Sequence, residues 1–469
     1  MFIHIEKQNA SIRNLLILLT TDFGKNILMT LSKKWIYLPV EVKSRELISK
    51  LFFANLATRT GFGVFIGRNG MNISRDVFPR GVYFDKCLSP HKIAFHKYQV
   101  ETLGNTLVSL DEESLIVDMK EHAQQRLTQE SIDLSSIIFT WGREEASVIN
   151  ERYDAREKVH VFGSPRIDVW RPEYQYIYER EIRDIKRRFG DFILVNSNFG
   201  AGVLPESRYN DEVRKYFEFT SNLRSEFLRL IRRIATEFPS RNVILRPHPG
   251  EEQGLWASLE AQFPSNVHII LEGSVSPWIR ASSLLIHHCC TTAVEASIVR
   301  TPIISYEPPL DGYPDYEPFH DLPSALSRRM TRPEDVLSAI RDGISDDSLL
   351  RSTQLSMAQK YLCFDEHELC SQKIISQLIK LSVEEEVYEI PSFTTWKKLR
   401  HIVGRAKYRL SDMWDQNHIP LRYHLQKNPG MDLDEIIGLV DQLEVGSGQS
   451  GIPLQIRQVD VDTFCLFRE

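Results

Sequence analysis

Cysteine is scarce in this chain, with six cysteines among 469 residues. No two of them stand in the CxxC spacing of a zinc ribbon or a redox pair, so the sequence gives no basis for either site. Sparse, unpaired cysteines suit a protein kept in a reducing cytoplasm. The six are Cys87, Cys289, Cys290, Cys363, Cys370 and Cys465.

Long apolar runs are also missing near the start of the chain. The longest early run, residues 15–19, is far shorter than the roughly 20 residues that cross a bilayer, and no small-residue cleavage site follows it. We therefore expect neither a signal peptide nor a membrane span, and a cytoplasmic location.

Two nucleotide-binding signatures are absent as well. No GxxxxGK[ST] segment occurs, and Gly61 and Gly63 lie between a helix and a strand rather than after a first strand. These absences argue against kinases and ordinary dehydrogenases. The formal charge of −6 gives no general attraction to a polyanion, so we expect no nucleic-acid partner.

What is present is the composition of a globular protein, with 42% hydrophobic and 26% charged residues. Short β-rich runs alternate with helical patterns, which predicts parallel α/β sheets. The first series of runs is at 35–40, 62–67, 81–84, 106–110, 137–140 and 159–162, and the second is at 192–195, 243–245, 267–270, 284–286 and 302–305. We expect an α/β fold of two Rossmann-like domains facing a cleft, with a helical C-terminal extension.

The expected domain boundaries follow from these two series. They are an N-terminal extension (1–33), a first domain that takes the acceptor (34–165), a linker (166–185), a second domain that binds a nucleotide-sugar (186–385) and a helical, basic extension (386–469).

The strongest local signal is the strand 284–286, which runs through a short loop into a helix. Thr292 and Glu295 have the spacing of a capping box, so a helix start is predicted there, with free backbone N–H groups that suit a phosphate. The hydroxyls of Thr291 and Thr292 would add hydrogen bonds. Capping boxes are common, however, and most of them bind nothing.

A metal interpretation of the preceding residues 287–290, His-His-Cys-Cys, is disfavoured. Neighbouring side chains on a strand point to opposite faces, so they do not converge on one ion. We expect neither a metal nor another cofactor.

The second signal is the turn at 246–249, Arg-Pro-His-Pro. Proline on both sides of His248 restricts the backbone, so the imidazole is presented to bind or protonate a leaving phosphate, with Arg246 beside it. The plain alternative is a turn histidine satisfied by its neighbours. Asn196, directly after the strand 192–195, is counted with the same donor site. Loops at the carboxyl ends of parallel strands line the ligand crevice, so we expect these groups to converge.

The third signal lies in the first domain. Asp111, Glu112 and Glu113 follow the strand 106–110, where carboxylates face the cleft and can deprotonate an acceptor hydroxyl or attack the sugar. They would equally cap the next helix. We predict that one of the three is catalytic, together with His248.

Several of these segments resemble a family of bacterial surface-carbohydrate biosynthesis proteins, transferases of lipopolysaccharide and capsule loci. The resemblance spans about residues 35–435 and implies a glycosyltransferase of the GT-B kind. Its carriers are YLPVEVKSRE at 37–46, VSLDEE at 108–113, FGSPRID at 162–168, RPHP at 246–249, HCCTTAVEA at 288–296 and KNPG at 427–430.

The His-Pro pair and the threonine pair are also similar to motifs of bacterial sialyltransferases and Kdo transferases. That similarity implies that His248 and Thr291 or Thr292 grip the phosphate of a CMP-sugar, and that Glu295 reaches the ribose. It also implies that the acidic stretch supplies the base, although Ser114 stands where those enzymes have glycine. The expected partners are a nucleotide-sugar donor and a glycan or lipid-linked glycan acceptor.

Three other functions stay open. CDP-polyol phosphotransferases share an Arg-x-His-Pro and a Gly-x-Pro-Arg-x-Asp element, a nucleotide-sugar epimerase has the same architecture, and an assembly factor would have no enzymatic activity. A basic cluster interleaved with apolar residues suits either an anionic membrane surface, for peripheral contact with the inner membrane, or a solvated helix face. The cluster is Lys397, Lys398, Arg400, His401, Arg405, Lys407 and Arg409.

Overall fold

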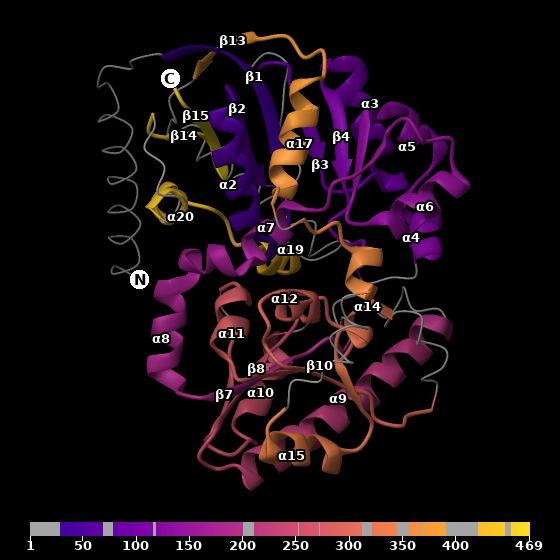
Figure 1. Ribbon diagram of the computed structural model, residues 1–469, viewed down its shortest axis with the longest axis vertical. Helices are drawn as coiled ribbons and strands as arrows, with labels where there is room; N and C mark the ends of the chain where they lie inside the picture. The colour runs from indigo at the N-terminus through magenta and orange to yellow at the C-terminus, as the bar shows by residue number, and fades with distance from the viewer. Residues whose placement is uncertain are drawn as a thin grey trace, which may run out of the picture.

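The computed structural model has two α/β halves, each built on its own sheet (Figure 1). It describes residues 29–68, 78–115, 119–199, 211–251, 253–271, 273–311, 321–344, 356–365, 367–390, 421–445 and 452–469. The basic cluster at 397–409 therefore lies outside the described residues.

The first sheet has a parallel centre formed by buried apolar runs. The strands are β1 (Met29–Val40), β2 (Phe62–Arg68), β3 (Val82–Asp85), β4 (Thr106–Leu110), β5 (Ile137–Thr140) and β6 (Val159–Val161). The order β2-β1-β3-β4-β5-β6 is parallel throughout. Because both faces of such a sheet are covered, its strands read as continuous hydrophobic runs, as predicted.

Strands from the end of the chain complete this sheet. β13 (Glu386–Ile390) pairs antiparallel with the start of β1, and β15 (Thr463–Phe467) joins β2 to β14 (Gln455–Asp460). Tyr388 of β13 packs edge-on against Trp35 and Phe65, with ring centroids 5.5 and 5.3 Å away. The C-terminal region thus contributes strands to the first sheet in addition to the helices that the sequence predicted.

The second sheet is parallel in the order β12-β11-β10-β7-β8-β9. Its strands are β7 (Phe192–Asn196), β8 (Asn242–Arg246), β9 (Val267–Ile269), β10 (Leu284–His287), β11 (Ile303–Tyr306) and β12 (Arg328–Met330). The predicted strands agree to within a residue or two, and β12 was not predicted. β7 lies between β10 and β8, so the loops after these three strands are neighbours.

Helices cover both sheets. Those of the first half are α2 (Lys43–Arg59), α3 (Ile93–Lys97), α4 (Met119–Arg126), α5 (Gln129–Leu134), α6 (Arg143–Arg152) and α7 (Pro165–Trp170). Then come α8 (Glu179–Phe189), α9 (Asp211–Glu237), α10 (Gln253–Glu260), α11 (Ser276–Ala281), α12 (Thr292–Ile298), α14 (Asp321–Ala325), α15 (Pro333–Asp342), α17 (Cys370–Ile379), α19 (Leu421–Lys427) and α20 (Leu433–Val445). Of the described helices, none is both long and apolar enough to cross a membrane.

The segment Gly163–Asp168, which follows the last strand of the first half, is fixed by specific contacts with residues near α17. Gly163 has φ 79°, and an added Cβ would lie 2.6 Å from the Cys363 carbonyl oxygen, so glycine is required. Ser164 caps α7 through a hydrogen bond from the Arg166 N–H, and the Asp168 carboxylate accepts from the first N–H groups of α17 at 2.9 and 2.8 Å. α17 therefore returns from the second half to lie on the first, as Figure 1 shows.

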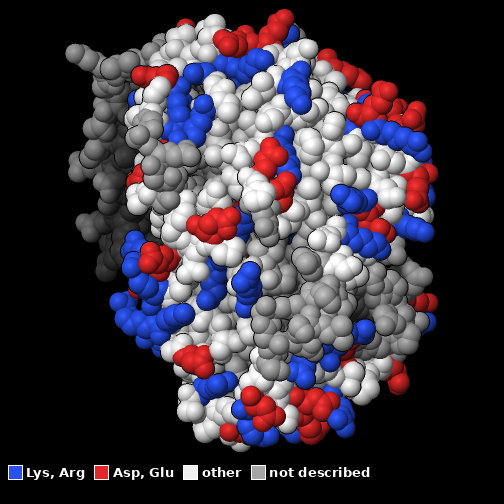
Figure 2. Space-filling model, viewed as in Figure 1, with Lys and Arg blue, Asp and Glu red and all other residues white. Residues whose placement is uncertain are grey.

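Charges of both signs are interspersed over the face of the molecule shown in Figure 2. Recognition of an anionic ligand on this face would therefore depend on a local arrangement of cations rather than on a broad field.

Candidate functional site

Three loops meet at the carboxyl edge of the second sheet, and the tripeptide Asn196-Ser197-Asn198 links them. Asn196 Nδ2 donates to Thr292 Oγ1 at 2.9 Å, and Asn198 Nδ2 donates to the Cys289 carbonyl oxygen at 2.8 Å. On the other side, the His248 N–H donates to Ser197 Oγ at 2.9 Å. The predicted donor residues Asn196, His248 and Thr292 thus lie in adjoining loops.

The loop before α12 has an unusual backbone. Cys289 has φ 42°, a conformation that non-glycine residues rarely adopt. The buried His287 accepts the Cys290 N–H at its Nδ1 (3.3 Å) and pairs with Ser327 Oγ through its Nε2 (2.8 Å). His287 is therefore a structural support of this loop. Strain of this kind is common near functional sites.

The predicted capping box at the start of α12 does not form. The helix begins at Thr292 as expected, but its N-cap is Thr291, whose side chain makes no cap hydrogen bond. The Glu295 side chain is instead buried, and burial raises the pKa of its carboxyl although the positive charge of Arg280 and the Ser276 hydroxyl partly oppose that rise.

Glu251 organises the loop that carries His248, a role that the sequence analysis missed. Its buried carboxylate accepts from Ser197 Oγ and the Phe199 N–H, both at 2.6 Å, and from Trp256 Nε1 at 3.0 Å. The only sequence signal was an acidic residue just after Pro249 and Gly250. One carboxylate thereby fixes the β7 and β8 loops relative to each other.

The His248 ring has a defined tautomer. The Gly250 N–H donates to its Nδ1 at 3.0 Å, so in the neutral ring Nε2 carries the hydrogen. Surrounding protein atoms, followed by the positive charges of Arg45 and Lys427, lower the pKa of His248 to about 4. Although many protein atoms lie near the ring, His248 is exposed to solvent. At neutral pH the ring is an uncharged hydrogen-bond donor.

Arg246 points away from the threonine pair. Its Nη2 donates to the Gly273 carbonyl oxygen at 2.9 Å, and its guanidinium lies 5.2 Å from the centre of the Trp278 ring. Arg246 thus supports the β9 side of the edge, and among the contacts of the described residues none joins it to Thr291 or Thr292.

The three carboxylates of the first half have different environments. Arg126 binds Asp111 with two nitrogens, at 2.8 and 3.0 Å, and His122 Nε2 lies 3.4 Å away. Burial alone would raise the pKa of Asp111, but His122 and Arg126 outweigh it and hold the pKa well below its usual range. Asp111 is thereby committed to structural contacts.

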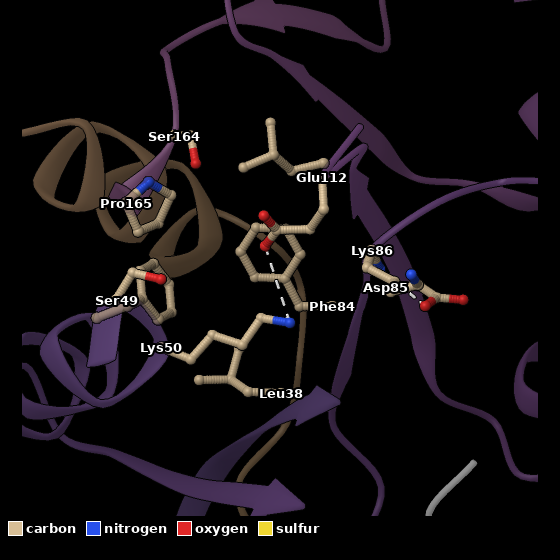
Figure 3. Close-up of a pocket in the computed structure, with 11 residues that line it drawn as sticks. Leu38, Ser49, Lys50, Phe84, Asp85, Lys86, Glu112, Ser164 and Pro165 are labelled. Carbon is tan, nitrogen blue, oxygen red and sulfur yellow. Dashed lines mark hydrogen bonds and ion pairs between the residues drawn. The ribbon is translucent and has the colours of Figure 1, made fainter. Parts of the chain in front are cut away.

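Glu112 faces a small cavity of about 20 Å³, enough for about one water molecule (Figure 3). Its Oε1 lies 3.8 Å from Lys50 Nζ and its Oε2 lies 3.6 Å from Arg166 Nη1. Within the described part of the chain, no donor makes a hydrogen bond to Oε2. Glu113 is more exposed and lies near Arg45 and Arg126.

Arg166 connects the two halves electrostatically. Its guanidinium stacks 4.9 Å from the Trp170 ring and 5.4 Å from the Trp141 ring, beside Glu112. Burial lowers the pKa of Arg166, and Glu112 and Glu295 oppose that effect. The chain of charges Glu112, Arg166 and Glu295 thus runs from the first half to α12.

No group of three or more His, Cys, Asp or Glu side chains that would hold a metal ion exists in the parts of the chain described above.

Comparisons with known proteins were made by sequence and by structure. No protein-family model and no curated protein matches the sequence. The solved structure of the wall teichoic acid polymerase TagF aligns with a TM-score of 0.50 and 10% identity, over 74% of this chain and 89% of that one.

Two further solved structures align less closely. HepE of Anabaena with UDP and glucose gives a TM-score of 0.39 and 12% identity, over 74% of this chain and 100% of that one. S. aureus MnaA with UDP gives 0.45 and 14%, over 74% and 96%. At such low identity the likeness to TagF concerns the fold alone, and it confirms the predicted α/β fold of GT-B type, two Rossmann-like halves with parallel sheets.

Proposed function

We propose that this chain is a glycosyltransferase of surface-polysaccharide biosynthesis that uses a nucleotide-sugar donor. The observation that carries the proposal is the convergence of the β7, β8 and β10 loops, which place Asn196, His248 and Thr292 at one edge of a Rossmann-like sheet. Ligands of such sheets bind at this edge. The shared fold with a wall teichoic acid polymerase supports the class.

In this proposal the donor phosphate lies between His248 and the two threonines. The His248 Nε2–H donates to a phosphate oxygen. From the other side the Thr291 hydroxyl donates, or the Thr292 hydroxyl in place of its present bond to Cys290 Sγ. Neutral donors fixed before the ligand arrives stabilise the negative charge that grows on the leaving phosphate. Arg246, at the end of β8, supports this edge through its contacts with the Gly273 carbonyl and the Trp278 ring, and Glu295 supports it from within α12.

Glu112 is the proposed base. It is buried and faces a cavity, and one of its oxygens has no hydrogen-bond donor in the described part of the chain. Asp111 differs from Glu112, because Arg126 and His122 already contact its carboxylate. A carboxylate oxygen without a hydrogen-bond donor can accept the proton of an acceptor hydroxyl as the sugar is transferred.

We propose CMP as the nucleotide of the donor and an acidic keto-sugar as the group transferred, from the similarity of the His-Pro and threonine motifs to CMP-sugar enzymes. A CDP-polyol phosphotransferase is the second candidate, favoured by the Gly163–Asp168 and Arg246–Pro249 segments. The mass of the product separates them, because a polyol would arrive together with a phosphate.

The experiment that tests the nucleotide is thermal unfolding with CMP, CDP, UDP or GDP. A ligand at 100 times its Kd stabilises the folded state by about 2.7 kcal/mol. A rise in melting temperature with CMP that is lost in the His248→Ala variant would support the CMP-sugar transferase. A shift confined to CDP would favour the polyol enzyme, one confined to UDP a UDP-sugar transferase or an epimerase, and no shift with any nucleotide would contradict the proposal.

We also propose a cytoplasmic location with peripheral contact to the inner membrane through the basic cluster at 397–409. Flotation with anionic vesicles tests the contact. Reversal of the charges of Lys397, Lys398 and Arg400 should abolish flotation, and unchanged flotation would count against this surface.

A further inference from the structure

A short segment near the end of the chain lies against both halves. We call residues 426–430 (Gln-Lys-Asn-Pro-Gly) the strap. The buried Asn428 donates to the Val40 carbonyl oxygen at 3.2 Å, and the Gly430 carbonyl oxygen accepts from Lys43 Nζ at 2.6 Å. Lys427 Nζ pairs with Glu41 Oε1 at 3.1 Å. These contacts fix the strap on the end of β1 and the start of α2.

At its other end the strap holds the loop that carries His248. The side-chain nitrogen of Gln426 donates to the carbonyl oxygens of Pro249 and Glu251, at 2.6 and 2.7 Å. These carbonyls lie on either side of Gly250, whose N–H sets the tautomer of His248. A single amide group therefore ties this loop to a segment anchored on the first half.

The strap also contributes one of the positive charges near the imidazole, that of Lys427. The groups that act on His248 come from three elements: Arg45 of α2, Lys427 of α19 and Glu113 of the loop after β4. Glu41 is held between Lys86 and Lys427, which keep the pKa of Glu41 at about 2 although burial alone would raise it. The two cations that act on His248 are thus positioned by residues of the first half, Arg45 by Glu46 and Lys427 by Glu41.

We propose that Gln426 is a positioning residue for His248, and that the strap presents the imidazole to the ligand only while it is seated on the first half. The donor site at the edge of the second sheet then depends on a segment from the far end of the chain. The identification of the ligand as a donor phosphate rests on the proposed function, whereas the positioning rests on the contacts above.

The test is Gln426→Leu, which removes both hydrogen bonds and keeps a side chain of similar size. Backbone deuterium exchange is measured at the His248, Gly250 and Glu251 amides, because Pro247 and Pro249 have none. We expect these amides to exchange about tenfold faster or more. Exchange at the imidazole C2–H between pH 3 and 9, followed by mass spectrometry, reports the pKa of His248. We expect that pKa to rise towards its ordinary value.

Gln262→Leu is the matched control, because Gln262 also donates from its side chain to a backbone carbonyl, that of Ser258, in an exposed place. It should change neither readout. If a folded Gln426→Leu protein behaves like this control, the proposal is wrong.

Lys427→Gln is the second variant and decides the matter if Gln426→Leu does not fold. It removes one cation near His248 and the pair with Glu41, so the pKa of His248 should rise while the loop keeps both Gln426 bonds. Because the variant also removes the pair that seats the strap on the first half, exchange at the Gly250 and Glu251 amides should rise as well. If neither this exchange nor the pKa changes, the role of the strap is overturned. CMP and CDP binding is measured in parallel; if the wild-type protein binds no nucleotide, the proposed function fails and the exchange data still decide on Gln426.

Discussion

The side-chain amide of Asn196 donates to the Thr292 hydroxyl at 2.9 Å and joins the end of β7 to the first residue of α12. Asn196 is buried, and no donor within the described residues reaches its Oδ1. An oxygen left without a partner at a sheet edge is available to a ligand hydroxyl or amine. This hydrogen bond directly links two of the predicted donor-binding residues.

Replacement of Thr292 by valine should weaken both folding and nucleotide binding. Valine has the same shape but leaves the buried Asn196 amide without its acceptor, at a cost of about 1–3 kcal/mol. Urea unfolding measures the cost, and the thermal shift with nucleotide measures binding. The control is Thr236→Val, since that hydroxyl donates to the Arg232 carbonyl on an exposed helix face. Equal effects of the two changes would contradict the role of Thr292.

Asp111→Asn should destabilise the protein in a pH-dependent way. The pKa of Asp111 is lower in the folded state than its ordinary value of 3.8, because His122 and Arg126 outweigh burial. Its carboxylate therefore stabilises the fold above pH 3.8, by about 1.5–3 kcal/mol for charged hydrogen bonds. This advantage should disappear as the pH falls from 3.8 towards the folded pKa. Urea unfolding at pH 7 and at pH 3 gives the comparison, and a constant difference would refute the assignment.

Glu112→Gln should separate binding from transfer. Nucleotide binding should persist, because Glu112 lies in the loop after β4 of the first half and the proposed donor site lies on the second. The transfer rate should fall about 10²–10⁴-fold if Glu112 is the base. Product formation by mass spectrometry measures the rate. Glu113→Gln is the neighbouring control, since the more exposed Glu113 pairs with Arg126 and Arg45. A variant at Glu113 with the larger loss would move the proposed base to that residue.

Glu145→Gln should stabilise the protein at high pH and not at low pH. Glu145 accepts from Ser114 Oγ at 2.6 Å and the Trp141 N–H at 2.8 Å, and burial raises its pKa to about 7. The folded state therefore keeps a proton that the unfolded state loses above pH 4.5, so wild-type stability falls between pH 4.5 and about 7 and then levels off. Urea unfolding of both proteins at pH 4.5, 6 and 8 measures the difference in their free energies of unfolding. This difference should grow between pH 4.5 and about 7.

Much of the fold was predictable because the signals that define it are local. The apolar runs at Thr106–Leu110 and Ile137–Thr140 coincide with β4 and β5, since a buried parallel strand must be hydrophobic along its whole length. β15 was missed although Thr463–Phe467 is just as apolar. A run of five residues carries little signal by itself, and its partner β2 lies about 400 residues earlier in the chain.

The convergence of the β7, β8 and β10 loops at one sheet edge was predictable, whereas their local contacts were less so. Asn196, His248 and Thr292 fall at strand ends, and strand ends at one edge of a parallel sheet must be neighbours. The capping box at Thr292 and Glu295 did not form, and the Glu295 side chain is buried near Arg280 and Ser276 instead. The pattern identified residue types suited to a cap, but the competing partner lay outside its window.

The sequence by itself determined the strands, the loops at their carboxyl ends and the chemical groups in those loops, because apolar periodicity and turn residues act over a few positions. Only the tertiary structure decided which of these groups are paired with other residues and which remain available to a ligand. Arg126 occupies Asp111 and leaves Glu112 facing the cavity, and Gln426 reaches the Pro249 carbonyl from 177 positions away. Hydrogen bonds and ion pairs act across space, so no local pattern records which distant partner a side chain meets.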